Sequence, residues 1–301
     1  MAIFFTLNSM CNKKNLTMNL KHHLPLVGRL YKQRDKARAE RNAAINQTKK
    51  ASGNIGDYTL TTHRGLTLLL DKKNVLDRDI ANLGNFENEQ LDYLTEQAIK
   101  LLKQDSQVTF LDVGTNWGLY TLTMAAAGVK NLHAFEPDAR NIAHLQTNLL
   151  LNGALEKTKI HALAVWKESG EVSFATTAEN ETRDRGWAQI ISEETPAIED
   201  KKGKKIKLGT TTLPAVSLDD AFAGMIHQTL ILKIDTEGAE AQVLQGASHL
   251  LAQNAVLIQV ENHAHNRKEF LKKLPKNLSV VHTIEPDLYL ANPAMQKKLG
   301  L

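Results

Sequence analysis

The sequence predicts an α/β fold in which a mostly parallel sheet carries helices on both faces. Apolar segments typical of buried strands alternate with helical segments from residue 108 onward, which is the pattern of successive β-α-β units. Polar or acidic residues follow most of these strand segments. The first strand also runs into a turn with two glycines before a helix, as at the entry of a nucleotide-binding unit. Together these observations predict a ligand site at the carboxyl ends of the strands.

The central segment, residues 108–118, reads Val-Thr-Phe-Leu-Asp-Val-Gly-Thr-Asn-Trp-Gly. Its first six residues are expected to form a buried strand, and a helix is expected at 117–127. Gly114 and Gly118 carry no Cβ, so the backbone can turn sharply between these elements and approach a ligand closely.

Asp112 stands directly before the glycines, where a carboxylate disfavours a phosphate and suits a cationic ligand. The segment also lacks the middle glycine of the G-x-G-x-x-G dinucleotide fingerprint. S-adenosylmethionine fits these constraints as a cofactor, because it carries an ammonium group and a sulfonium but no phosphate.

The other elements follow from apolar periodicity and turn residues. For example, apolar residues at 91, 94, 98, 101 and 102 have a helical period, and Pro137-Asp138 is typical of a helix start. Strands are expected at 58–63, 66–70, 131–135, 159–165, 172–175, 230–234, 256–260, 279–284 and 288–290, and helices at 86–102, 139–151, 239–252 and 269–274.

We expect four regions along the chain. Residues 1–28 are a flexible tail, and 29–50 are a basic helical arm without glycine or proline. Residues 51–84 are a linker and a small β extension, and 85–301 are the main domain. Within it, the polar stretch 176–210 breaks the alternation and is interpreted as a substrate lid, with a plain surface hairpin as the alternative.

Composition is that of a soluble protein, with 42% hydrophobic residues and a mean hydropathy of −0.31. Cys11 is the single cysteine, which excludes an intrachain disulfide or a cysteine-based zinc site and fits a cytoplasmic location. No apolar run approaches the roughly 18 residues of a membrane span.

Charge is distributed unevenly. Residues 1–50 hold eleven Lys and Arg against two acids, whereas the remainder holds 26 against 31. The arm could therefore contact an anionic surface, but a solvated helix is the favoured interpretation. Apolar residues recur every seven positions in the arm, which is compatible with weak association into a homo-oligomer.

Glu136 lies 18 residues after Gly118, at the end of the second strand, where a carboxylate can accept both hydroxyls of a ribose. Pro137 and Ala164 stand at strand ends on the same edge and are further cofactor candidates. Asn116 has an amide suited to the tight turn or to the ligand carboxylate. Trp117 could stack on the ligand, but core packing is favoured.

Several segments together resemble the FkbM family of S-adenosylmethionine-dependent methyltransferases. They are Asp112-Val-Gly-Thr-Asn-Trp-Gly118, Phe135-Glu-Pro-Asp138, Ala162-Leu-Ala164, Thr212-Leu-Pro-Ala-Val-Ser-Leu-Asp-Asp220 and above all Lys233-Ile-Asp-Thr-Glu-Gly-Ala-Glu240. The resemblance covers about residues 85–262 and implies a Rossmann-like class I fold with a seven-stranded sheet. It also implies O-methylation of a hydroxyl on a sugar, a glycan or a small metabolite. Thr115 stands where the family usually has alanine.

An alcohol acceptor loses a proton during methylation, so a base is expected near it. Asp235, Glu237 and His263 are the catalytic candidates by position. As alternatives, Asp235 could cap the following helix, and Glu237 and Glu240 could favour its first turn electrostatically.

Lys233 could pair with Asp235 or Glu261. His263 and His265 lack a clear third ligand, so we predict no structural metal. Assistance by a divalent metal at Asp235 stays open.

Two other classes of function compete. A nicotinamide-dependent oxidoreductase could use Glu136 in the same way, but Asp112 and the missing glycine oppose it. A non-catalytic scaffold could retain the fold. Nucleic acid is not expected as a partner, because Asp235-Thr-Glu-Gly stands where a base-flipping NPPY segment would follow the fourth strand.

Overall fold

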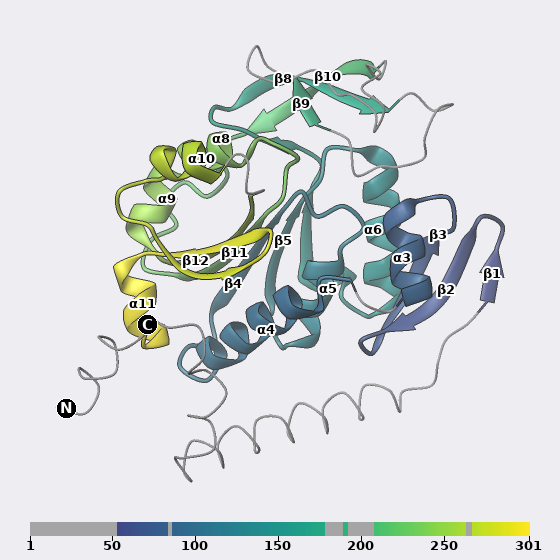
Figure 1. Ribbon diagram of the computed structural model, residues 1–301, viewed down its shortest axis with the longest axis horizontal. Helices are drawn as coiled ribbons and strands as arrows, with labels where there is room; N and C mark the ends of the chain where they lie inside the picture. The colour runs from purple at the N-terminus through teal and green to yellow at the C-terminus, as the bar shows by residue number, and fades with distance from the viewer. Residues whose placement is uncertain (1–52, 84–85, 178–188, 192–207, 263–266) are drawn as a thin grey trace, which may run out of the picture. The chain divides into compact units, whose positions relative to one another are not determined.

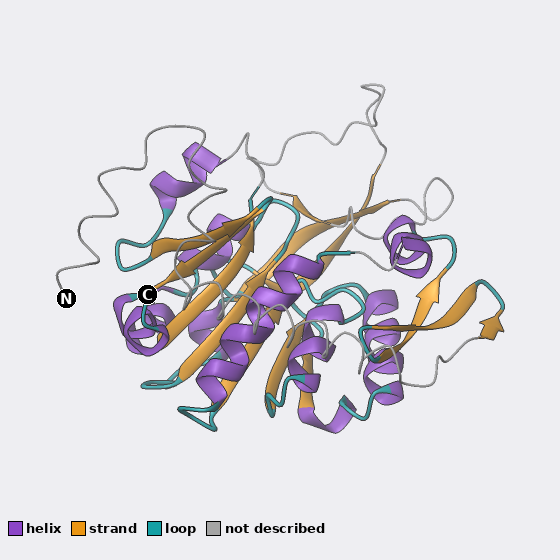
Figure 2. Ribbon diagram, turned by 60° about the horizontal axis from the view of Figure 1, so that its bottom comes forward, coloured by secondary structure: helices purple, strands orange, loops and turns teal. Residues whose placement is uncertain are grey.

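A seven-stranded sheet with helices on both faces forms the body of the protein (Figures 1 and 2). This computed structural model describes residues 53–83, 86–177, 189–191, 208–262 and 267–301. The chain divides into residues 1–50 and 51–301, and the described residues all belong to the second unit. The predicted tail and arm, and most of 176–210, lie outside the described residues, so the interpretations placed on them stay predictions.

The strands of the main sheet lie in the order β13-β14-β12-β11-β4-β5-β6. All pairs from β12 to β6 are parallel, and β14 runs antiparallel to both of its neighbours. The first strand of this sheet, β4, lies inside it. The chain continues outward from β4 through β5 and β6, and it then returns to form β11 on the other side of β4. The seven-stranded, mostly parallel, Rossmann-like arrangement is therefore confirmed. The bounds of its strands are β4 (Val108–Val113), β5 (Asn131–Phe135), β6 (Thr158–His161), β11 (Thr229–Ile234), β12 (Ala255–Glu261), β13 (Ser279–Ile284) and β14 (Asp287–Ala291).

Two smaller sheets accompany the main one. β1 (Gly53–Ile55), β2 (Tyr58–His63) and β3 (Leu66–Asp71) form the first, and the second has the order β7-β10-β8-β9. The latter consists of β7 (Ala164–Val165), β8 (Gly170–Thr177), β9 (Gln189–Ile191) and β10 (Leu208–Val216).

The helices are α3 (Val75–Leu83), α4 (Asn88–Leu102), α5 (Leu119–Ala126), α6 (Ala139–Leu151), the 3-10 helix η1 (Leu155–Lys157), α7 (Leu218–Ala221), α8 (Glu240–Gln245), α9 (Ser248–Gln253), α10 (Arg267–Lys273) and α11 (Pro293–Leu299). Among the described residues, no helix has the length and apolar character that a membrane crossing requires.

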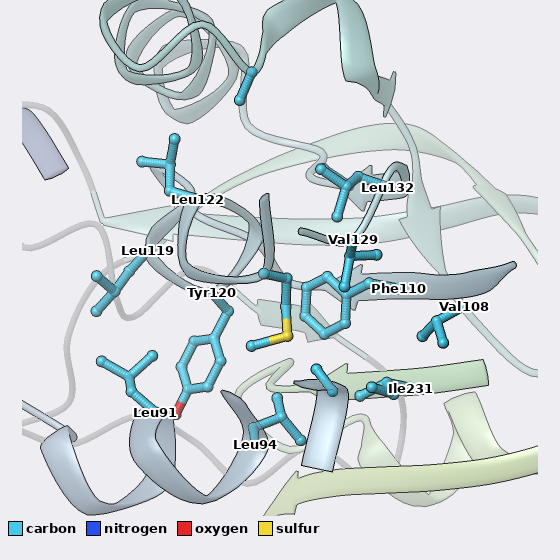
Figure 3. Close-up of a cluster of buried hydrophobic side chains, with 14 of the residues drawn as sticks. Leu91, Leu94, Val108, Phe110, Leu119, Tyr120, Leu122, Val129, Leu132 and Ile231 are labelled. Atoms are coloured by element: carbon cyan, nitrogen blue, oxygen red, sulfur yellow. The ribbon is translucent and has the colours of Figure 1, made fainter. Parts of the chain in front are cut away.

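Side chains that alternate along each strand fill two separate cores. On one face, Phe110 of β4 and Ile231 of β11 pack with α4 and α5, as Figure 3 shows. On the other face, their neighbours Leu111 and Leu232 pack with α8 and α9. A sheet buried on both faces explains why its strands read as nearly continuous apolar runs.

Two predicted elements differ from the structure. The expected strand at 159–165 divides into β6, which joins the main sheet, and β7, which pairs with β10 in the second sheet. The expected helix at 239–252 divides into α8 and α9 around Gly246. A Cβ on Gly246 would lie 2.4 Å from the carbonyl oxygen of Trp166, so the chain passes too close there for a side chain.

Six elements had not been predicted from the sequence: α3, η1, β9, β10, α7 and α11. In addition, residues 53–55 of the expected linker pair with β2 as a short strand. The described ends of the 176–210 stretch belong to β8, β9 and β10.

Two asparagines of α6 bind the free edge of β3. Asn148 Oδ1 accepts the backbone N–H of Leu69, and its Nδ2 donates to Leu69 O and Trp117 O. Asn152 makes the same pair of contacts with Thr67. Their spacing of four residues on a helix matches the two-residue spacing on the strand, so the amides replace a neighbouring strand.

Replacing Asn148 with alanine is expected to lower the free energy of unfolding by about 2–4 kcal/mol. The substitution removes three contacts of a fully buried side chain and leaves the buried backbone groups of Leu69 and Trp117 with fewer partners. Urea unfolding of the full chain measures this loss. Thr147→Ala on the exposed side of the same helix is the matched control and should change the stability by less than about 1 kcal/mol. Equal losses of unfolding free energy in both variants would contradict the role of Asn148 in holding the edge of β3.

Candidate functional site

The turn after β4 is shaped by the close approach of β11. Gly114 has φ +79°, and a Cβ there would lie 1.7 Å from the carbonyl oxygen of Asp235. Gly118 has φ +96°, and a Cβ there would lie 2.5 Å from Leu145 Cδ1 of α6. Both glycines are therefore required by the packing of the protein itself, whereas the sequence suggested close approach to a ligand.

Asp112 is buried behind this turn. Its Oδ2 accepts hydrogen bonds from the hydroxyl of Thr115 and from both the backbone N–H and the hydroxyl of Thr121. These contacts tie the end of β4 to the first turn of α5. Burial raises the pKa of Asp112, and its hydrogen bonds oppose that shift. Thr115, the departure from the family pattern, thus supplies one of the donors.

Glu136, the residue after β5, lies beside the turn that follows β4. Its Oε2 accepts from Asn116 N at 2.9 Å, and its Oε1 accepts from Asp138 N at 2.9 Å and from Asn141 Nδ2 at 3.3 Å. Asn116 adopts φ +51°, which turns its N–H toward Glu136. The side chain is therefore held in one orientation, with only 5% of its surface exposed. Burial raises the pKa of Glu136 to about 7.

A pocket opens beside Glu136 at the carboxyl ends of the strands. Its polar wall comes from the ends of β4, β5 and β11, and its apolar wall comes largely from β7, β8 and β9 of the second sheet. The lining residues are Val113, Gly114, Asn116, Phe135, Glu136, Pro137, Asn141, Leu163, Ala164, Val165, Phe174, Ile190, Asp235, Thr236 and Glu237.

Five of the seven predicted cofactor residues line this pocket: Gly114, Asn116, Glu136, Pro137 and Ala164. Asp112 and Gly118 lie behind the lining and shape the turn. Trp117 is buried in the core with 2% of its surface exposed, as the favoured interpretation held. Sequence reasoning missed Asn141, although its place in the first turn of the helix that follows Glu136 could have indicated it. The apolar wall was missed because the second sheet had not been recognised.

The end of β11 carries a buried ion pair. Lys233 Nζ lies 3.0 Å from Asp235 Oδ2, and the lysine is almost wholly buried whereas Asp235 is partly exposed. Burial opposes the charged ammonium, but the carboxylates of Asp235, Glu87 and Asp287 outweigh it and raise the pKa of Lys233. The lysine is thus held as a cation, and the ion pair orients Asp235.

Glu240 stabilises the turn that follows β11. Its Oε1 accepts from the backbone N–H groups of Thr236 and Gly238 and from the Thr236 hydroxyl. This supports the structural interpretation of Glu240. The N-cap of α8 is Ala239, without a side-chain cap bond, so the alternative in which Asp235 caps this helix is not realised. Asp235 and Glu237 instead line the pocket.

A polar cluster beneath Lys233 was not foreseen. The Lys233 ammonium lies 5.0 Å from the ring centroid of Tyr120, whose hydroxyl hydrogen-bonds Glu87 and accepts from Gln259 Nε2 at 2.7 Å. Asp287 reaches the same cluster from β14. These residues come from five separate parts of the chain, so only the tertiary fold brings them together. His263, the third catalytic candidate, lies outside the described residues.

Comparison with known proteins agrees with this architecture. Residues 112–295, more than half of the chain, match the model of the methyltransferase FkbM domain. No curated protein matched the chain. Similar solved structures include WbdD (10% identity, 71% of this chain and 42% of that chain, TM-score 0.41).

Two further solved structures are similar at the same level. They are methyltransferase FkbM from Methylobacillus flagellatus KT (13% identity, 73% and 56% of the two chains, TM-score 0.38) and ribosomal protein L11 methylase from Lactobacillus delbrueckii subsp. bulgaricus (14% identity, 68% and 79%, TM-score 0.37). The chain spans less than two thirds of WbdD and of the Methylobacillus protein. The family match, together with the glycine turn, Glu136 and the Lys233–Glu240 segment within it, leads to one assignment: the chain belongs to the FkbM family of methyltransferases.

Proposed function

We propose that this methyltransferase uses S-adenosylmethionine and methylates a hydroxyl of a sugar, a glycan or a small metabolite. The observation that carries the proposal is the fixed, buried Glu136 carboxylate on the wall of a pocket with a polar and an apolar side. The acceptor class comes from the family resemblance, and the pocket supports the cofactor.

The pocket fits each part of S-adenosylmethionine. Glu136 can accept the two ribose hydroxyls, and the apolar wall with Phe174 and Ile190 suits an adenine ring. Asp235 and Glu237 give the pocket negative charge, which suits the ammonium and sulfonium of the cofactor. Among the described residues that line the pocket, none is basic, so the set offers no side-chain cation for a pyrophosphate. This composition favours S-adenosylmethionine over a nicotinamide dinucleotide.

When bound, the cofactor supplies a methyl group on an already activated sulfonium. The residues of the chain then have to hold the acceptor oxygen in line with that methyl group and exclude water. They also have to accept the hydroxyl proton. Asp235 and Glu237 are the described carboxylates of the pocket that are partly or wholly exposed, and His263 remains a candidate from its place in the sequence.

Methyl transfer to a panel of acceptors tests the proposal. The full chain is incubated with S-adenosylmethionine carrying a radiolabelled methyl group and with matched pairs of sugars, one bearing a free hydroxyl and one already O-methylated there. Label in the free sugar alone supports O-methylation. Label that enters only amines, or the protein and nucleic acid fractions, would contradict the acceptor class.

Binding of the cofactor's nucleoside is expected to strengthen as the pH rises from 6 to 8. Two ribose hydroxyls need an ionised carboxylate, and the pKa of Glu136 is about 7 because the group is buried. About a tenth of Glu136 is ionised at pH 6 and about nine tenths at pH 8, so the Kd should fall about tenfold. Asp138 is the charged neighbour, and Asn116 and Asn141 are the neutral donors that face Glu136.

A suitable probe is 5′-methylthioadenosine, since it has the ribose but lacks the amino acid group that titrates in the same range. Its Kd is measured at several pH values for the native chain and for Glu136→Gln. The variant should bind weakly and independently of pH. A native Kd that is flat between pH 6 and 8 would show that Glu136 is not the titrating acceptor.

A further inference from the structure

Three carboxylates converge beside the pocket. One oxygen each from Asp235, Glu237 and Glu261 lies within 4.8 Å of the others. Asp235 follows the last residue of β11, and Glu261 ends β12. Because Ile234 and Val260 are partners in the parallel ladder, the two acids emerge side by side at the same edge of the sheet. Glu237 reaches the same place from the turn after β11.

A second observation points to a missing partner at this place. Asp287 is 2% exposed, and its Oδ1 has no hydrogen-bond partner. It lies directly opposite Glu261 in the antiparallel ladder, so both side chains project from the same face of the sheet. Asn262, the residue after Glu261, is 7% exposed, and its Oδ1 also has no partner. A buried oxygen of Asp287, on the same face of the sheet as Glu261, is therefore left without a donor.

Electrostatics agree with a cation at this place. Burial, the charge of Asp235 and a hydrogen bond with Asp235 raise the pKa of Glu261, and the charge of Lys233 opposes that shift. Burial, and again the charge of Asp235, raise the pKa of Asp287. Lys233 binds one oxygen of Asp235 at 3.0 Å and so fixes the direction of that carboxylate.

We propose that Asp235, Glu237 and Glu261 bind one divalent metal ion of the Mg²⁺ or Mn²⁺ class. Carboxylate oxygens are the ligands that such hard ions prefer. Mg²⁺ binds oxygen at about 2.1 Å, so ligands on opposite sides are about 4.2 Å apart, and a spacing of up to 4.8 Å needs only small side-chain shifts. The sequence predicted no structural metal and left assistance by a divalent metal at Asp235 open, and it did not place Glu261 beside Asp235.

The role of the ion deepens the proposed function and rests on it. A metal ion at the edge of the pocket binds the acceptor hydroxyl and lowers its pKa. The O–H bond then breaks, its electron pair stays on the oxygen, and the proton passes to a carboxylate of the pocket. Lys233 is a positioning residue here, because it orients Asp235 without touching the acceptor.

Manganese binding to the full chain tests the site without using activity. Free Mn²⁺ is counted by electron paramagnetic resonance as it is added, and Mg²⁺ is then added as a competitor. The expected result is one Mn²⁺ per chain, displaced by Mg²⁺. Asp235→Asn and Glu261→Gln should each weaken binding at least tenfold.

Glu237→Gln is the cluster variant whose effect on Mn²⁺ binding cannot be attributed to unfolding. Glu237 is exposed, so its replacement should leave the thermal midpoint unchanged. Glu269→Gln removes an acid on α10 that is paired with Lys272, outside the cluster, and is the matched control that should bind Mn²⁺ like the native chain. No Mn²⁺ binding at millimolar concentration, or equal binding by the native chain and all three cluster variants, would overturn the site.

The same samples are titrated with S-adenosylmethionine so that two failures can be told apart. Cofactor binding without Mn²⁺ binding would overturn the metal site and leave the proposed function in place. Mn²⁺ binding that the cluster variants lose, without any cofactor binding, would support the site and overturn the function proposed for it.

Discussion

Replacing Glu136 with glutamine is expected to weaken S-adenosylmethionine binding by roughly a hundredfold. The carboxylate can accept both ribose hydroxyls, and a hydrogen bond to a charged group contributes about 1.5–3 kcal/mol. The amide keeps the shape of the side chain but presents an NH₂ group to one hydroxyl. Loss of about 3 kcal/mol corresponds to a factor of roughly a hundred in Kd. Isothermal titration calorimetry measures it directly.

Glu136 also supports its own loop, so the variant needs a fold control. Its two oxygens accept the backbone N–H groups of Asn116 and Asp138, and one of these contacts is lost in the amide. The thermal midpoint of the variant should fall by only a few degrees. Glu156→Gln, on the exposed 3-10 helix η1, removes the same charge elsewhere and should leave the Kd unchanged. Native-like affinity in a folded Glu136→Gln chain would exclude Glu136 as the ribose acceptor.

Replacing Gly114 with alanine is expected to destabilise the fold by more than about 4 kcal/mol. An added Cβ would lie 1.7 Å from the carbonyl oxygen of Asp235, and φ is +79°, so steric overlap and backbone strain act together. The overlap involves the backbone of a central strand, which cannot move without disturbing the β4–β11 pairing. Urea unfolding, or the yield of folded protein, gives the result.

Gly128→Ala separates the two causes. Gly128 also has a positive φ, +101°, but its nearest foreign atom, Leu102 Cδ1, would lie 3.8 Å from an added Cβ. This variant should therefore lose only the strain energy, about 1–2 kcal/mol. Equal destabilisation by both substitutions would mean that the contact with β11 contributes little.

The sequence was most informative where one segment determines both an element and its chemistry. The strand, turn and helix at 108–127 are found as β4 and α5, and Glu136 lies at the end of β5 on the pocket wall, as predicted. The role of Asp112 differs in detail, because its acceptor oxygen is occupied by Thr115 and Thr121 within the protein. The sequence position of Asp112 indicated a functional acid at the turn, but its burial directs its hydrogen bonds to residues of the protein.

Elements without a strong apolar pattern could not be predicted. β10 contains three successive threonines and Pro214, so its sequence lacks the apolar pattern of a strand. It is defined mainly by its pairing with β8. α3 is short and polar, and among its residues whose side chains are described the buried ones are Asp77 and Ile80. The cluster of Glu261 and Asp287 depends on an antiparallel register between distant strands, which no local pattern specifies.

The most direct test of the account is a calorimetric titration of the full chain with S-adenosylmethionine, with NAD titrated in parallel. The geometry of Glu136, the apolar wall and the acidic edge predicts micromolar binding of S-adenosylmethionine at one site per chain and no detectable binding of NAD. Binding of NAD in preference to S-adenosylmethionine, or binding of neither, would contradict the proposed function.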